Sequence, residues 1–303
     1  MRVYGHHAVN SEPSALAAPL TPTQIPPGAI DAHATVFIAD RRAAPGAAVV
    51  PEAEAPIERY LDVLDGNGMA GGVLVQPRSR SHDNSYLLHS IARVPARFRG
   101  IAAVSPTIGR EELARLRSAG VAGVRLDLVG REPPDFTAAP WPQHFVALVQ
   151  AGLHLQVHAE GPRWLQILKP LLAGGVRLVV EHFGLPSEGM GPRCPGFQNL
   201  VAASRGDDIW FKLSAPYRST PPNTAWACAD VLLTIPGVGR LVWGSDWPWP
   251  RPDQIERYAD TIDWLAEWVP HHAAREQILG ANARTLFGFN KPAGVAAPPW
   301  KRL

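Results

Sequence analysis

The stretch Arg240-Leu-Val-Trp-Gly-Ser-Asp246-Trp-Pro-Trp-Pro250 decides the fold of this chain. A short apolar run carries one carboxylate to its end, and a turn rich in Trp and Pro follows directly. Parallel β/α barrels present catalytic groups in this way, on the C-terminal tips of buried strands. Asp246 is therefore a candidate catalytic base, provided that the rest of the chain supplies a barrel and partners for it.

The same pattern recurs along the chain, because short apolar runs that end in a polar residue alternate with segments of helical period. The expected strands are Ala29–His33, Gly72–Gln76, Ile101–Ser105, Val121–Arg125, Leu153–His158, Val176–His182, Ile209–Ser214 and Leu241–Asp246. The expected helices are Pro56–Leu64, Asn84–Val94, Glu111–Ala119, Gln143–Ala151, Arg163–Ala173, Phe197–Ser204, Ala225–Leu233, Gln254–Trp268 and Ala273–Leu286. Near-continuous apolar strands that alternate with helices predict a parallel sheet covered on both faces.

Eight such units predict a single (β/α)₈ TIM barrel of class α/β. A doubly wound open sheet is the structural competitor, but no Gly-x-Gly-x-x-Gly follows the first strand. We expect an N-terminal arm over residues 1–27, the barrel over 28–289 with extra C-terminal helices, and a Pro-rich tail over 290–303.

Composition excludes several classes of protein. The 303 residues are 46% hydrophobic and 18% charged, which is typical of a globular enzyme rather than a disordered chain. A formal charge of +2 without a basic block argues against a nucleic-acid partner. Two cysteines suggest neither a disulfide framework nor a cysteine metal site. Without an apolar run of ~18 residues we expect no membrane partner and a cytoplasmic protein; a homo-oligomer remains open.

The polar residues at the ends of the expected strands form an unusual set. They are His33, Gln76, Ser105, Arg125, His158, His182, Lys212 with Ser214, and Asp246. In a parallel barrel these ends meet at one mouth. Charged groups are rarely buried without partners, so three imidazoles, two cations and a carboxylate at one mouth predict a shared site.

Four motifs carry a resemblance to a known family. They are Asp31-Ala-His33-Ala-Thr35-Val-Phe37, Glu181-His182-Phe-Gly, Lys212-Leu-Ser-Ala-Pro-Tyr217-Arg218 and Gly244-Ser-Asp246-Trp-Pro, with Gln76-Pro and Asn282-Ala-Arg-Thr-Leu-Phe-Gly288 as further matches. Together they resemble the amidohydrolase superfamily, which has a metal-dependent-hydrolase-like barrel. More narrowly, they resemble the branch that contains 2-pyrone-4,6-dicarboxylate lactonase.

The resemblance implies roles for several residues. Asp246 would activate water, and His33 and His182 would polarise a lactone carbonyl. Arg125, Tyr217 and Arg218 would hold substrate carboxylates. The lactonase branch works without a metal, unlike most of the superfamily, so no cofactor is expected to be obligatory.

One position departs from the family pattern. The strand-1 motif of the family is His-x-His, and here the second position is Thr35. Side chains two apart on a strand point to one side, so this replacement removes either a metal ligand or an oxyanion donor. A lost oxyanion donor costs roughly 2.7–4 kcal/mol in a known case. Thr35 could still donate a weaker, neutral hydrogen bond.

The leading hypothesis is a metal-independent hydrolase of a small carboxylated lactone. Asp246 is the general base, and His33 and His182, helped by His158 or Lys212, stabilise charge on the carbonyl oxygen. The remaining substrate-binding candidates are Arg125, Tyr217, Arg218, Gln76, Arg78 and Thr35. Arginine suits the carboxylates because its fork is bidentate.

Two alternatives remain open. In a mononuclear metal-dependent amidohydrolase or decarboxylase, a Zn²⁺-like ion would take His33, His158, His182 and Asp246 as ligands. Thr35 argues against it, since a ligand is lost. The other alternative is a ligand-binding barrel without turnover, which the same replacement also motivates.

Overall fold

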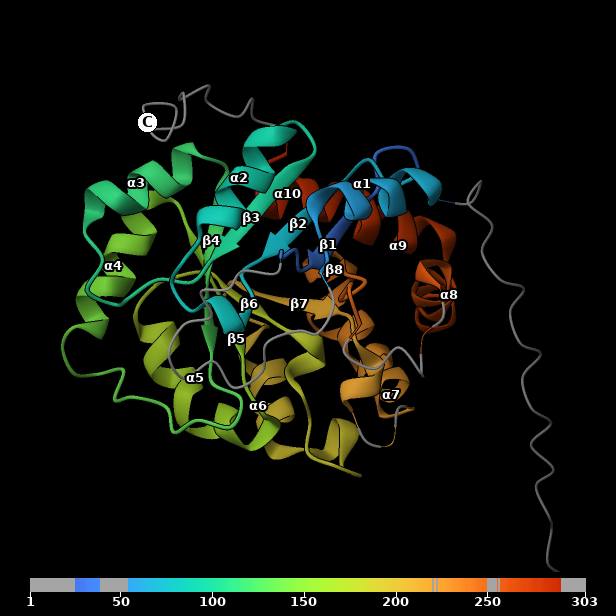
Figure 1. Ribbon diagram of the computed structural model, residues 1–303. Coiled ribbons are helices and arrows are strands. Elements are labelled where there is room, and N and C mark those ends of the chain that lie inside the picture. Colours follow the sequence, from blue (N-terminus) through green and yellow to red (C-terminus); the bar gives the residue numbers. More distant parts are fainter. Residues whose placement is uncertain are drawn as a thin grey trace, which may run out of the picture.

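The protein is built on one parallel sheet that curls into a barrel with helices around it (Figure 1). The computed structural model describes residues 25–38, 54–219, 221, 223–249, 255 and 257–289. The strands are β1 (Ile30–Ala34), β2 (Gly71–Val75), β3 (Phe98–Ala102), β4 (Val121–Asp127), β5 (His154–His158), β6 (Leu178–Val180), β7 (Ile209–Leu213) and β8 (Leu241–Trp243). They pair in chain order, so the predicted (β/α)₈ barrel is confirmed.

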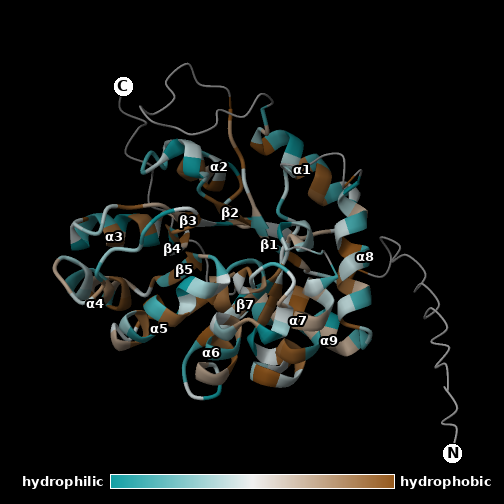
Figure 2. Ribbon diagram, turned by 90° about the horizontal axis from the view of Figure 1, so that it is seen from below, coloured by the Kyte–Doolittle hydropathy of each residue, from teal (hydrophilic) through white to brown (hydrophobic). Residues whose placement is uncertain are grey.

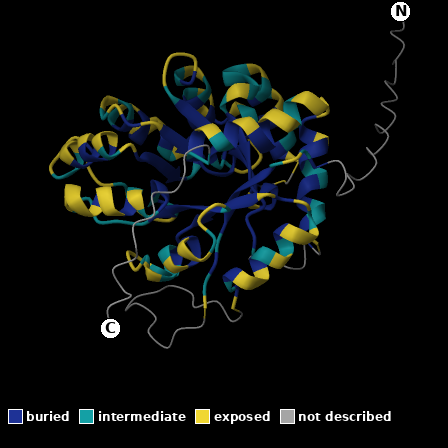
Figure 3. Cartoon of the chain, turned by 90° about the horizontal axis from the view of Figure 1, so that it is seen from above, coloured by how far each residue is buried: buried dark blue, intermediate teal, exposed yellow. Residues whose placement is uncertain are grey.

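The helices lie on the outside of the sheet, and all except the short α9 have buried residues. They are α1 (Ile57–Gly66), α2 (Ser85–Arg93), α3 (Arg110–Ser118), α4 (Trp141–Ala151), α5 (Trp164–Ala173), α6 (Pro195–Ala203), α7 (Thr224–Leu232), α8 (Tyr258–Trp268), α9 (His272–Glu276) and α10 (Ala283–Phe287). In α1, for example, the buried residues are Ile57, Tyr60 and Leu64, which a helix places on one side. Figure 2 shows hydrophilic and hydrophobic residues sharing these helices, and Figure 3 shows buried strands inside a layer of partly exposed helices.

The boundaries differ from the expected ones where the apolar pattern is broken. Strand β3 begins at Phe98 rather than Ile101. The charged Arg99 interrupts the apolar pattern in the sequence, but its side chain is buried in the strand and donates hydrogen bonds to backbone carbonyls. Ser105 therefore lies in the loop beyond the strand, where its hydroxyl contacts Thr107. The expected helix 273–286 is α9 and α10 joined by a π-helical segment, and α8 begins at Tyr258.

Some expectations fall on residues that the structure does not describe. The expected tail over 290–303 lies wholly outside the described residues, and so does the expected arm except for residues 25–27. In the part of the chain that is described, none of the helices combines the length and apolarity that a membrane crossing requires.

The barrel closes between β1 and the residues that follow β8. The Asp246 N–H donates to the His33 carbonyl at 2.9 Å, and the Thr35 N–H donates to the Trp247 carbonyl at 2.7 Å. Gly244 is required for this approach, because a Cβ at that position would lie 2.5 Å from the His33 Cβ. The closure therefore brings His33 and Asp246 side by side.

A buried carboxylate holds this seam together. The Asp31 side chain is 0% exposed and accepts hydrogen bonds from the backbone N–H groups of His33 and Ser245. It also accepts bonds from the hydroxyls of Ser245, Tyr60 and Tyr258. Burial raises the pKa of Asp31, and the bonds from Ser245 partly offset this effect. One side chain thus links β1, α1, α8 and the end of β8.

We predict that Asp31→Asn lowers the free energy of unfolding by about 3 kcal/mol or more, because the amide nitrogen cannot accept and leaves buried donors unpaired. Urea unfolding measures this change. The exposed residue Asp62 on α1 provides the control, since Asp62→Asn is expected to change stability by less than about 0.5 kcal/mol. Equal stabilities of the two variants would contradict the role of Asp31.

Candidate active site

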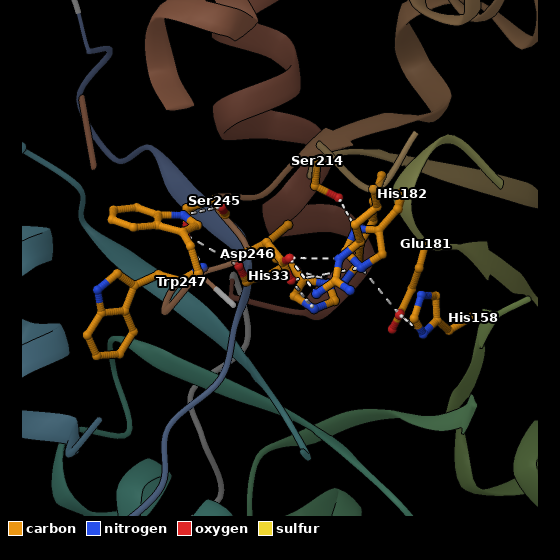
Figure 4. A network of polar contacts seen from close by, with 12 residues as sticks. His33, His158, Glu181, His182, Ser214, Ser245, Asp246 and Trp247 are labelled. Carbon is orange, nitrogen blue, oxygen red and sulfur yellow. Dashed lines mark hydrogen bonds and ion pairs between the residues drawn. The ribbon is translucent and has the colours of Figure 1, made fainter. Parts of the chain in front are cut away.

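The site lies at the C-terminal ends of the strands, where the barrel opens. Figure 4 shows His33, His158, His182 and Asp246 converging there from different strands. The ring centroids of His33 and His182 are 4.8 Å apart, and those of His158 and His182 are 5.1 Å apart. The structure therefore brings together the three imidazoles and the carboxylate that the strand ends predicted.

Three neighbouring strand tips have strained backbones. His182, Ala215 and Asp246, which follow β6, β7 and β8, have φ values of 49°, 51° and 60°. Non-glycine residues rarely adopt this left-handed region, and each instance costs of the order of 1–3 kcal/mol. Such strain persists only where the surroundings impose it, and it is common at functional sites.

The two oxygens of Asp246 have different surroundings. Oδ2 accepts hydrogen bonds from the Tyr217 hydroxyl and from Arg218 Nε and Nη2, the latter two at 3.0 and 2.8 Å. Oδ1 faces His33 Nε2 at 3.4 Å and His182 Nε2 at 3.8 Å. Burial alone raises the pKa of Asp246, but Arg218 and the hydrogen bond from Tyr217 outweigh it and lower the pKa below its usual value. The carboxylate is therefore ionised at neutral pH, with Oδ1 turned to the imidazoles.

The imidazoles of His33 and His182 are held neutral. Burial, reinforced by nearby cations, keeps the pKa of both His33 and His182 well below the usual value. The Nδ1 atom of His182 contacts Ser214 Oγ at 2.8 Å, and Nδ1 of His158 contacts Arg125 Nη2 at 3.0 Å. Within the described residues, Nε2 of His158 and Nε2 of His182 are buried without a hydrogen-bond partner. Each is available to a bound ligand.

Glu181 is a site residue whose role the sequence did not reveal. Its carboxylate accepts two bonds from Arg125, at 3.0 and 2.8 Å, and another from the Gln156 amide. Burial by itself raises the pKa of Glu181, but the charge and hydrogen bonds of Arg125 reverse the effect and hold the pKa well below its usual value. Asp127 adds a second carboxylate 3.2 Å from Arg125 Nη1. Arg125 is thus matched by two acids.

The other predicted residues lie around this centre. The Gln76 amide donates to the Asp83 carbonyl at 2.6 Å, and Arg78 donates to the Val129 carbonyl at 2.9 Å, so both tie loops together. Lys212 is fully buried behind His33. Thr35 is partly buried, and its N–H takes part in the closure of the barrel.

Two hollows flank the mouth. One, of about 320 Å³, lies on the side of β2 to β4 and includes Gln76, Arg78, Arg125, Asp127 and Arg131 in its wall. The other, of about 430 Å³, includes His158, Glu160, Tyr217 and Arg218. Both sizes suit a small molecule, and guanidinium groups in their walls favour anionic ones.

Two groups of side chains offer ligand atoms that could hold a metal ion. They are His33, His182 and Asp246, and His158, Glu181 and His182, with the ligand atoms of each group within 4.8 Å of one another. A metal-bound histidine normally donates its other ring N–H to a carboxylate or a carbonyl. Behind His33, however, Nδ1 faces the amine of Lys212 at 3.4 Å. The ligand count suits an ion, but the surroundings of His33 do not.

Comparison with known proteins identifies the family. The family model described as amidohydrolase matches residues 30–289, and the chain therefore belongs to the amidohydrolase family. It is 29% identical to the 4-sulfomuconolactone hydrolase of Rhizobium radiobacter, over 91% of this chain and 95% of that protein. It is 27% identical to the 2-pyrone-4,6-dicarboxylate hydrolase of Comamonas testosteroni, over 87% of this chain and 91% of that protein.

A solved structure shows the same fold. The crystal structure of a probable 2-pyrone-4,6-dicarboxylic acid hydrolase from Acinetobacter baumannii, with citric acid bound, superposes with a TM-score of 0.82. The two proteins are 29% identical, and the match covers 86% of this chain and 99% of that one.

We predict that Arg218→Met raises the pKa of Asp246 by at least about one unit, because an opposite charge at this distance typically lowers a carboxyl pKa by 1–3 units. A ¹³C NMR titration of the Asp carboxyl groups measures the pKa. Asp246 loses its charge as the pH falls through its pKa. Any activity that needs the carboxylate is therefore lost on acidification at a higher pH in this variant than in the wild type. An unchanged pKa, equal to that of the exposed control Arg193→Met, would contradict the electrostatic assignment.

Proposed function

We propose that this protein is a hydrolase that opens a small carboxylated lactone with water activated by Asp246. The observation that carries the proposal is that the ionised, buried Asp246 faces the neutral imidazoles of His33 and His182 with Oδ1, the oxygen that Arg218 does not contact. The names of two relatives support it, since both are hydrolases of carboxylated or sulfonated lactones. The related structure from Acinetobacter baumannii has citric acid, a polycarboxylate, bound to it, which agrees with a carboxylated substrate.

The geometry supports a general-base mechanism. Asp246 Oδ1 removes a proton from water, and the hydroxide adds to the lactone carbonyl carbon. The N–H groups of His33 and His182 donate to the oxygen that gains negative charge, and His158 Nε2 is available beside them. When the ring C–O bond breaks, the proton held by Asp246 passes to the leaving oxygen. The products are an opened acid and a hydroxyl or keto group.

The two arginines of the mouth differ in how accessible they would be to a carboxylate of the substrate. Arg218 is 32% exposed and lines one hollow while it contacts Asp246 Oδ2. Arg125 is 11% exposed and already pairs with Glu181 and Asp127. We propose that Arg218, with Tyr217, makes the main contact to a carboxylate, and that Arg125 contributes positive charge while it orients His158. Gln76, Arg78 and Thr35 would shape the other side of the mouth.

We predict that Asp246→Asn lowers kcat by about 10²- to 10⁴-fold on any lactone that the wild-type protein opens, because the amide cannot accept the proton from water. A panel of carboxylated and uncarboxylated lactones, followed by release of acid, measures kcat. The exposed residue Asp207 gives the matched control Asp207→Asn, which should retain wild-type turnover. Turnover by Asp246→Asn close to that of the control would remove Asp246 from the mechanism.

The same panel tests the alternative of a binding protein without turnover. A carboxylated lactone that raises the melting temperature of the wild-type protein, yet is recovered unchanged, would favour that alternative over the hydrolase.

A metal-dependent hydrolase is the second candidate, because the His33, His182 and Asp246 ligand atoms are close enough to share an ion. A bound ion would polarise the carbonyl and acidify water. We propose that no metal is obligatory, since Lys212 stands where a ligating His33 would need an acceptor.

We predict unchanged kcat after dialysis against a chelator, with metal content checked by elemental analysis. Activity that falls with the metal and returns with added Zn²⁺ would contradict this.

A further inference from the structure

Lys212 is a buried group of the site to which the mechanism above assigns no step. Its side chain is 0% exposed, and Nζ donates to the Ala32 carbonyl at 2.7 Å. Nζ also lies 3.4 Å from His33 Nδ1, while the opposite ring atom, His33 Nε2, lies 3.4 Å from Asp246 Oδ1. The ring of His33 therefore separates Lys212 from the mouth, so the lysine can act on a substrate only through His33.

The contact with Lys212 decides which nitrogen of His33 carries hydrogen. A neutral imidazole has one N–H and one lone pair, and an ammonium group only donates. The His33 ring is 2% exposed and lies beside the amine of Lys212, so a second positive charge on the ring is disfavoured. A charged amine beside Nδ1 makes Nδ1 the acceptor, which leaves the hydrogen on Nε2.

We propose that Lys212 is a positioning residue that holds His33 in the tautomer with hydrogen on Nε2, so that the ring donates into the mouth. The use of that donor for a lactone carbonyl rests on the proposed function, whereas the tautomer itself does not. A ring in this tautomer has no lone pair on Nε2 to offer to a metal.

The neighbouring rings follow the same arrangement. Ser214 Oγ contacts Nδ1 of His182, and Arg125 Nη2 contacts Nδ1 of His158. Nδ1 of His158 also lies 3.3 Å from Asp127 Oδ1, which only accepts, so Arg125 alone does not set the tautomer of this ring. In both rings Nδ1 makes the hydrogen-bond contact, and within the described residues Nε2 is buried without a hydrogen-bond partner. The position of the Lys212 amine is itself fixed, because the amine donates a hydrogen bond to the Ala32 carbonyl and lies 5.5 Å from the centre of the Phe287 ring.

The direct test is ¹⁵N NMR of the histidine rings in the ligand-free protein, with the His33 signals assigned from a His33→Gln variant. Burial lowers the pKa of Lys212 to about 7, so spectra are recorded below that pH. The wild-type protein should show a lone pair on Nδ1 and hydrogen on Nε2. Lys212→Met, which keeps the length but removes the donor, should show both tautomers. Hydrogen on Nδ1 in the wild type would overturn the proposal without any variant.

Kinetics separate positioning from simple structural support. On a lactone that the wild type opens, Lys212→Met should lower kcat by about 10- to 100-fold, the size of loss that is typical when the outer partner of a metal-bound histidine is removed. KM should stay within about twofold, because the lysine does not touch substrate. The exposed lysine of α5 gives the control Lys169→Met, which should behave as wild type. An altered tautomer with unchanged kcat would overturn the link to catalysis, and an unaltered tautomer would overturn the positioning role.

If no lactone is opened by the wild type, the proposed function fails but the NMR result still stands. If lactones are opened and Lys212→Met keeps the wild-type tautomer, the positioning role fails alone.

Discussion

The site depends on one buried carboxylate that accepts hydrogen bonds from both edges of the closing barrel. Asp31 binds the backbone N–H groups of His33 and Ser245, along with three hydroxyl groups from α1, α8 and the end of β8. Those two backbone contacts fix His33, which carries the first imidazole, and Ser245, which directly precedes Asp246. Without them β1 and β8 would have few constraints to keep them in register, because β8 itself is only three residues long.

Charge balance explains the rest of the mouth. At the mouth, Asp246 pairs with Arg218, and Glu181 pairs with Arg125, which Asp127 also contacts. Buried charges are tolerated only when they are paired in this way. The pairing keeps both carboxylates ionised, while burial lowers the pKa of His33 and His182 and keeps these two rings neutral. A neutral ring beside an ionised carboxylate is the combination that general-base attack on a carbonyl requires, because the base is free and the rings can donate.

The sequence predicted the barrel and the convergence of His33, His158, His182 and Asp246, because apolar runs mark the strands and the polar residue at each end marks the mouth. It did not show that Glu181 would pair with Arg125, since pairing between strands depends on register and on which acid is nearer. The place of Lys212 behind a ring, rather than beside a substrate, has the same origin. Motifs identify the residue types, and only three-dimensional contacts reveal which charges are already matched.

The central claim is that the carboxylate and the imidazoles act on one bound molecule. A crystal structure with a non-hydrolysable analogue of a carboxylated lactone tests it most directly. The account predicts the analogue's carbonyl oxygen within hydrogen-bond distance of Nε2 of His33 and His182, its carbonyl carbon beside Asp246 Oδ1 with room for one water, and a carboxylate on Arg218. An analogue bound with its carbonyl away from both rings, or with Asp246 turned out of the mouth, would contradict it.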